Sequence, residues 1–216
     1  MIYEDVFWAN HRVSACLDSY YTERYNADMD NRDVILQSAL QLFAARGYDA
    51  VGVQEIAETA GVTKPTLYHY FGNKEGLLED VLQTYFDALI QRVAAACEYQ
   101  HDLPLSLKNT TAAFFDFAVE NPIFYRMQLS MSFALPDGVV CRLVSLYQEN
   151  LIHLLEKLFK QAAQDHGNMI DREAAYALTF LGMVNTYITL FLVDREKLDD
   201  QVLHQAVHQF MHGVFS

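Results

Sequence analysis

The sequence predicts an all-α protein, and three observations support this prediction. Apolar residues recur at intervals of three and four through most of the 216 residues, strand-like alternation is rare, and the chain contains only 4 Pro and 9 Gly. So few turn-forming residues disfavour an all-β fold. The length corresponds to one or two domains, and an apolar share of 52% is sufficient to build a core.

Residues 1–28 are predicted to form an N-terminal amphipathic helical extension. Their apolar side chains, from Ile2 to Tyr20, are spaced by three and four, which predicts one helix or two short ones. The apolar stripe needs a partner surface. We expect that surface on the C-terminal domain or on another subunit.

Three short helices are predicted within residues 29–76. Asp30 and Asp33 form an acidic variant of the capping box before the first of them. Gly61 can adopt a left-handed turn after the second, and Thr63 can cap the third. The predicted ranges are Asn31–Arg46, Val53–Ala60 and Lys64–Phe71.

A long helix and five further helices are predicted in the rest of the chain. The Asn121-Pro122 step and the Pro136-Asp137-Gly138 turn are its clearest breaks. The expected ranges are Lys74–Glu98, Leu105–Glu120, Pro122–Phe133, Gly138–Asp165, Arg172–Val193 and Asp199–Phe215.

The segment Val53–Phe71 has the pattern of a helix-turn-helix, with apolar anchors in both helices and Gly61 at the turn. In such a motif the N-terminal end of the second helix enters the DNA major groove. Lys74 lies in the first turn of the next helix, where the helix dipole disfavours a cation. A nearby anion such as a DNA phosphate would explain a lysine at that position.

Residues 31–78 resemble the DNA-binding domain of the TetR family of transcriptional regulators. The matching residues are Ala39-Leu40, Leu42-Phe43, Gly47-Tyr48, Ile56-Ala57, Ala60-Gly61-Val62, Thr66-Leu67-Tyr68, Tyr70-Phe71, Lys74-Glu75 and Leu77-Leu78. The resemblance implies a homodimer that binds a near-palindromic operator on double-stranded DNA, usually as a repressor. A small-molecule effector in the C-terminal domain would release the DNA.

The resemblance also implies which residues bind DNA. Base edges would be contacted by Lys64, Thr66, Tyr68 and His69, and phosphates by Gln54, Thr63, Tyr70 and Lys74. Two departures from the family pattern affect this interface. Gly52 occupies the N-cap of the second helix, which weakens that cap, and Pro65 removes one backbone amide from the third helix.

Residues 77–216 are predicted to form a helical ligand-binding and dimerisation domain. Aromatic and Met residues are frequent there and could line a pocket for an apolar or aromatic effector, although a packed core has the same composition. The candidates are Phe117, Phe124, Tyr125, Met127, Tyr147, Met183 and Tyr187. We expect Arg126 to pair with an anionic ligand or with Asp116 or Glu120.

Twenty residues without a charge lie between Glu173 and Asp194, which is the length of a membrane span. Their Asn, Thr and Tyr content and the mainly acidic flanks favour a buried helix instead. The resemblance assigns Arg172–Val193 and Asp199–Phe215 to the homodimer interface. We therefore expect no membrane association.

The sequence offers no pattern that favours catalysis or a bound cofactor. It lacks the GxSxG, phosphate-loop and HExxH motifs, so we do not expect an enzyme. His204, His208 and His212 recur at every fourth residue, but this is more typical of a polar helix flank than of a metal site. Three scattered cysteines and acidic first residues favour a cytoplasmic location over secretion.

The net charge of −13 is the main argument against DNA binding. The charge is unevenly distributed, however: residues 1–30 carry −4, residues 31–76 carry −1 and residues 77–216 carry −8. DNA affinity should therefore depend on a few placed contacts. The alternative function is a dimeric helical interaction module that has lost DNA binding.

Overall fold

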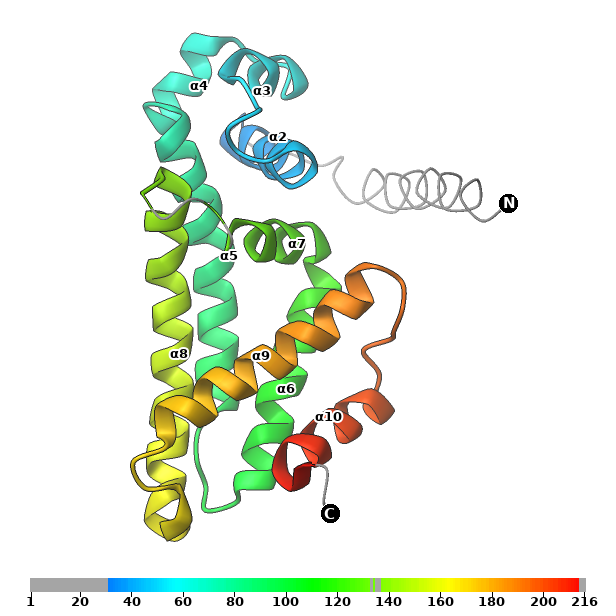
Figure 1. The fold of residues 1–216 in the computed structure, drawn as a ribbon. Helices are drawn as coiled ribbons and strands as arrows, with labels where there is room; N and C mark the ends of the chain where they lie inside the picture. Colours follow the sequence, from blue (N-terminus) through cyan, green and yellow to red (C-terminus); the bar gives the residue numbers. More distant parts are fainter. Residues whose placement is uncertain (1–30, 133, 135–136, 214–216) are drawn as a thin grey trace, which may run out of the picture.

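The computed structural model describes residues 31–132, 134 and 137–213, and this part of the chain is helical without strands. The predicted extension over residues 1–28 and the predicted capping residue Asp30 lie outside the described residues. Figure 1 shows three short helices at one end of a long, mostly lengthwise bundle, with one helix crossing the bundle obliquely.

The three short helices are α2 (Asn31–Arg46), α3 (Val53–Thr59) and α4 (Lys64–Phe71). The Thr63 hydroxyl caps α4 by accepting a hydrogen bond from the amide of Thr66 at 3.4 Å. Gly61, between α3 and α4, has a φ of +67°, a conformation that glycine adopts without strain. Local sequence signals therefore set the bounds of these helices, as predicted.

Helix α5 (Lys74–Ala96) joins the short helices to the rest of the molecule. Asn73 caps it through a 2.9 Å bond from the Gly76 amide to its side-chain oxygen. One face of α5 is fully buried along its length, from Leu77 to Val93. Because α5 is continuous, the predicted boundary between residues 76 and 77 lies inside one helix.

The C-terminal helices are α6 (Leu103–Glu120), α7 (Pro122–Met131), α8 (Val139–Asp165), α9 (Glu173–Leu192) and α10 (Asp200–His212), with a short 3-10 helix at Gly167–Met169. Helix α8 lies beside α5, and α9 crosses α6 on the near side in Figure 1. Helix α6 begins two residues earlier than predicted, because Asp102 caps it through the Leu105 amide at 2.9 Å.

Aromatic side chains form the centre of the C-terminal core. Phe124 on α7 stacks on Tyr85 with ring centroids 4.8 Å apart, and its edge meets Phe86 at 5.1 Å. Phe86 in turn stacks on Tyr147 of α8 at 4.7 Å. These contacts hold α7 beside the α5–α8 pair, and α7 also packs on α2.

Candidate DNA interface and adjoining cleft

The helix-turn-helix exposes a row of polar side chains on α4. Its anchors Ile56, Ala57 and Leu67 are buried, so the two helices keep a fixed relation to each other. Lys64, Tyr68 and His69 are exposed. This row of exposed side chains begins at the N-terminal end of α4. A recognition helix presents the same end to base pairs.

Thr63, Thr66 and Gln54, three of the predicted DNA contacts, already have polar partners. The Thr66 hydroxyl lies 2.9 Å from that of Thr63, and the Gln54 amide donates to the Glu58 carboxylate one turn later. Gly52 provides no side-chain cap for α3, as predicted. A DNA contact by Gln54 would therefore require its side chain to leave Glu58.

Lys74 has a partner that the sequence analysis did not identify. Its ammonium lies 4.1 Å from the centroid of the Tyr48 ring, within the range of a cation–π interaction. Burial lowers the pKa of Lys74, and the neighbouring charge of Asp49 opposes that shift. The stacked lysine is thereby held at the base of α5, close behind α4.

A cleft of about 1650 Å³ lies between the short helices and the C-terminal bundle. Its walls come from α2, α7 and α9, with smaller contributions from α5 and α8. Typical small-molecule pockets have volumes of ~300–1,000 Å³. The cleft is large enough for a bulky ligand, and one of its walls belongs to α2, the first of the three short helices.

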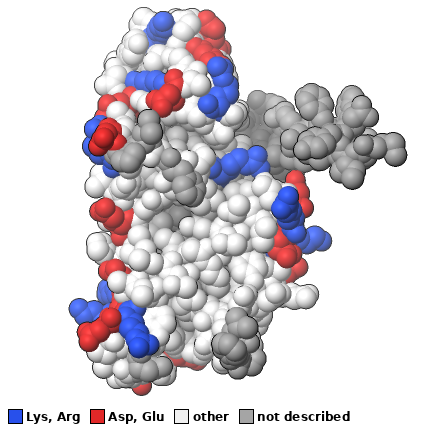
Figure 2. Space-filling view, viewed as in Figure 1, with Lys and Arg blue, Asp and Glu red and all other residues white. Residues whose placement is uncertain are grey.

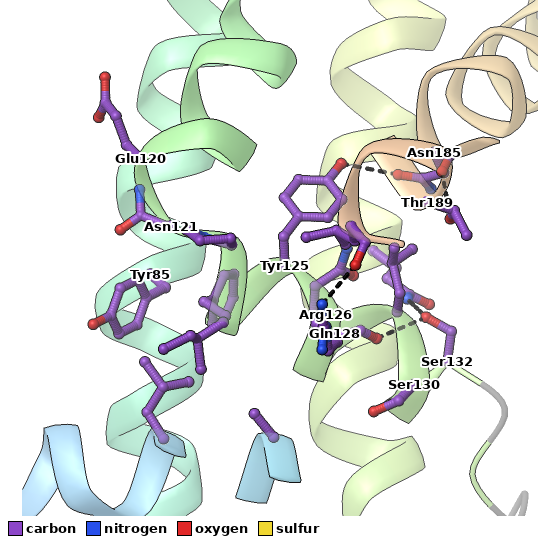
Figure 3. Close-up of a pocket in the computed structure, with 18 of the residues that line it drawn as sticks. Tyr85, Glu120, Asn121, Tyr125, Arg126, Gln128, Ser130, Ser132, Asn185 and Thr189 are labelled. Atoms are coloured by element: carbon purple, nitrogen blue, oxygen red, sulfur yellow. Dashed lines mark hydrogen bonds between the residues drawn. The ribbon is translucent and has the colours of Figure 1, made fainter. Parts of the chain in front are cut away.

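Helix α7 is connected to both sides of this cleft. The Tyr125 hydroxyl donates to the side-chain oxygen of Asn185 on α9 at 2.9 Å, and Arg126 donates to the carbonyl oxygen of Leu192 at 2.6 Å. Figure 3 shows both side chains reaching from α7 toward α9. Tyr125 is fully buried, and burial raises the pKa of its hydroxyl.

The structure distributes the seven predicted ligand residues among different environments. Phe124 and Tyr125 line the cleft. Phe117 and Met127 are buried in the core, and Tyr147 stacks on Phe86. Met183 and Tyr187 line a second, smaller hollow between α9 and α10. The structure thus brings only two of the seven together in this cleft.

The sequence did not reveal the contribution of α2 to the cleft, and neither Asp116 nor Glu120, two of the three partners expected for Arg126, pairs with it. The lining residues of α2 include Val34, Gln37, Ser38 and Gln41. Glu120 pairs with Arg92 instead of Arg126. The apolar spacing of α2 revealed that it has a buried face, but not that α7 would lie against it.

The described residues contain no group of three or more His, Cys, Asp or Glu side chains arranged to hold a metal ion. His208 and His212 lie one turn apart with ring centroids at 4.5 Å. Of the three cysteines, Cys97 is buried and Cys141 is half-buried, and both are free thiols.

Comparison with known proteins identifies the N-terminal unit. Residues 35–81 match the family model described as bacterial regulatory proteins, tetR family. The chain is 39% identical over 98 residues to the transcriptional activator FasR of Mycolicibacterium smegmatis, which covers 45% of each protein. It is 44% identical over 61 residues to the repressor KstR2 of the same species, and this match covers 28% of this chain and 30% of the relative. These matches span less than half the length of the relatives.

The similarity in fold extends over most of the chain. The fatty acid degradation regulator FadR from Bacillus subtilis, solved in complex with stearoyl-CoA, matches with a TM-score of 0.70 at 17% identity. That match covers 84% of this chain and 98% of the other. Residues 35–81 therefore match the N-terminal unit of the tetR family of bacterial regulatory proteins, and the chain shares its all-helical fold with the regulator FadR.

Proposed function

We propose that this protein is a ligand-responsive transcriptional regulator that acts in the cytoplasm and binds a near-palindromic operator as a homodimer. The observation that carries the proposal is the exposed polar edge of α4, presented by a helix-turn-helix with a buried, capped framework. Lys64, Thr66, Tyr68 and His69 are proposed to contact bases. Gln54, Thr63, Tyr70 and Lys74 are proposed to contact phosphates.

An exposed apolar face on α9 supports the proposed homodimer. By length and composition α9 could cross a membrane, yet less than a third of its apolar stretch is buried inside the molecule. One face packs on the bundle through Phe180, Val184 and Ile188. Figure 2 shows a broad surface without charges in this region, while Lys, Arg, Asp and Glu gather over the short helices and along the margins.

A second copy of the chain would cover this face. Leu178 on α9 and Val193 at its C-cap are more than half exposed, and Gly182 lies between them. All three also line the cleft, so the proposed dimer face adjoins the proposed effector site. Helices α9 and α10 of two protomers would then form a four-helix interface, the arrangement that a two-fold dimer produces. An interface of this kind removes apolar surface from water, which is the main driving force for stable association.

We assign the effector site to the cleft and propose repression as the mode of regulation. The structural neighbour FadR holds stearoyl-CoA, and an acyl-CoA ester is therefore the first effector to test here. The relatives include both an activator and a repressor. A ligand between α2 and α9 would change how the DNA-binding unit sits on the dimer, and hence the spacing of the two recognition helices.

Substitutions at two proposed phosphate contacts test DNA binding. Tyr70→Ala and Lys74→Ala should weaken binding to every duplex, and Lys74→Ala should reduce the salt slope by about one. Binding would be measured by fluorescence anisotropy on a duplex selected from a random pool. Lys160→Ala, at an exposed position on α8, serves as the control and should bind as the unmodified protein does. Unchanged affinity in both variants would show that the proposed docking is wrong.

The dimer is tested at Gly182. A Cβ atom added there meets no other atom within 4 Å in the single chain, so Gly182→Arg fits the protomer. The added charge should separate the dimer in analytical ultracentrifugation. Gly167→Arg makes the same change at another open position outside α9 and should leave the dimer intact. A dimeric Gly182→Arg variant would exclude this face as the interface.

A further inference from the structure

The cleft contains one cation, Arg126, whose guanidinium has no carboxylate within 4 Å among the described residues. It makes a single hydrogen bond, to the backbone carbonyl of Leu192. A guanidinium offers five N–H donors, and Arg126 is exposed, so its other donors face solvent and are accessible to a ligand. Arginine at such a position is well suited to bind a carboxylate or a phosphate.

The Leu192 carbonyl is one of the four that the C-terminal end of α9 leaves without a partner inside the helix. The neighbouring carbonyls of Leu190 and Phe191 accept from the amides of Arg195 and Asp194. Arg126 therefore supplies a cap that the following loop does not. Anything that draws Arg126 into the cleft removes that cap from α9.

A second polar group in the cleft also lacks a partner. Gln128 is 5% exposed, lines the cleft, and its side-chain amide makes no hydrogen bond to another described residue. Among the described residues, every side-chain N or O atom that is fully shielded from solvent has a hydrogen-bond partner. The amide of Gln128 must consequently open onto the cleft, where a bound ligand could satisfy it. Figure 3 places Gln128 and Arg126 on the same helix at the cleft.

The remaining walls are well suited to an apolar chain. Leu151 is buried, Leu181 is half-buried, and the stacked rings of Tyr85 and Phe124 contribute a further apolar surface. Two acids line the cleft: Glu120 is already paired with Arg92, and Asp194 lies in the loop after α9. An apolar interior with one unpaired cation predicts an amphipathic ligand that carries a negative charge at one end.

We propose that the cleft binds a large amphipathic anion and that Arg126 exchanges the Leu192 carbonyl for the anionic head group of this ligand. The exchange would couple ligand binding to the end of α9, which we assign to the dimer interface. Helix α7 also packs on α2 of the DNA-binding unit. This inference rests on the proposed function, because it specifies the effector of that same regulator and the residue that senses it.

Two probes of equal chain length, one anionic and one neutral, distinguish binding through the charged head group from binding through the apolar chain. Palmitate, below its micellar concentration, and hexadecanol, below its solubility limit, would be titrated into the full chain. The unmodified protein should bind palmitate more tightly. Arg126→Gln should weaken palmitate binding about tenfold, which corresponds to about 1.4 kcal/mol, and leave hexadecanol binding unchanged. Unchanged hexadecanol binding also shows that the variant is folded.

Further variants isolate the role of the charge. Arg126→Lys should recover part of the preference for palmitate. Lys160→Gln removes a cation from an exposed position outside the cleft and should change neither affinity. Palmitoyl-CoA identifies the source of the anion: if it binds more tightly than palmitate and still depends on Arg126, the head group is a phosphate. The proposal is overturned if neither anion binds, or if Arg126→Gln binds both as the unmodified protein does.

Operator binding by the same ligand-free proteins is measured in parallel. A protein that binds palmitate through Arg126 but enriches no duplex contradicts the proposed function and leaves the cleft assignment intact. A protein that binds its operator but shows no Arg126-dependent anion binding contradicts only the cleft assignment.

Discussion

The helix-turn-helix and the cleft differ in how far apart in the sequence their contacting residues lie. The caps of α4 and α5 join residues three apart, Thr63 to Thr66 and Asn73 to Gly76. The cleft is held together by contacts such as Gln37 to Tyr85 and Tyr125 to Asn185, which are 48 and 60 residues apart. Short-range contacts can be inferred from a sequence pattern, whereas long-range contacts require the packed fold.

The helix-turn-helix and the cleft also differ in how tightly their residues are packed. The helix-turn-helix encloses a dense apolar core and exposes its polar edge to solvent. The cleft has a volume of about 1650 Å³ and unpaired polar groups on its wall. Substitutions in the first region should mainly destabilise the protein or weaken DNA binding. Substitutions in the second should mainly alter coupling between α7 and its neighbours.

The largest expected effect is at Gly76, in the short-range region. A Cβ atom there would lie 2.3 Å from the backbone oxygen of Phe71, and a backbone atom cannot move aside easily. Gly76→Ala should lower the free energy of unfolding by about 3 kcal/mol, the upper part of the range for overpacking. Urea denaturation measures this change. Gly167→Ala meets no atom within 4 Å and should be nearly neutral; equal stability of the two variants would contradict the account.

A smaller effect is expected at Tyr125, in the long-range region. Tyr125→Phe removes the donor to Asn185 and should cost about 1 kcal/mol of unfolding free energy, since the amide oxygen loses its partner. Tyr187→Phe is the matched control, because its hydroxyl makes a longer, exposed contact of 3.3 Å with Gln209. Thermal denaturation of both variants gives the comparison. If both lose the same stability, the buried link contributes nothing specific.

The contact between Lys74 and Tyr48 sharpens the account of the DNA interface. Tyr48→Leu removes the ring that holds the lysine ammonium and should weaken operator binding about two- to fivefold, as expected for an exposed cation–π interaction. Anisotropy titrations on cognate and scrambled duplexes would show the same proportional loss on both. A loss confined to the cognate duplex would instead assign base recognition to this pair.

The smallest effect concerns the far end of the bundle and depends on pH. Hydrogen bonds from His101 and then Tyr99 lower the pKa of Asp165. A carboxyl with a lowered folded-state pKa stabilises the protein above its unfolded pKa, and this contribution is lost as the pH falls through the folded value. Asp165→Asn should therefore slightly flatten the loss of stability below about pH 4. Melting temperatures across this pH range provide the test.

The helical fold and the helix-turn-helix could be predicted because their signals are local. The predicted ranges Asn31–Arg46 and Lys64–Phe71 coincide with α2 and α4, since Gly47 and Thr63 mark their ends. At the other helices the bounds shift by a few residues. The start of α6 was missed because the cap at Asp102 and Pro104 in the first turn were not recognised.

The cleft could be predicted only in part. Phe124 and Tyr125 belong to an aromatic run that indicated burial near a pocket, and both line it. Composition cannot distinguish them from Phe117, which is buried in the core. The role of Arg126 depends on where α9 ends relative to α7, and no spacing within α7 contains that information. The seven predicted ligand residues and the eight predicted DNA contacts remain predictions.

The most direct test of the central claim is selection from a pool of random DNA duplexes at low salt with the full chain. The account predicts enrichment of a two-fold symmetric sequence, bound by a dimer, with the affinity reduced when palmitate or palmitoyl-CoA is present. Enrichment of no sequence would contradict the assignment of α4 as a recognition helix. That result would instead favour a dimeric helical interaction module that has lost DNA binding.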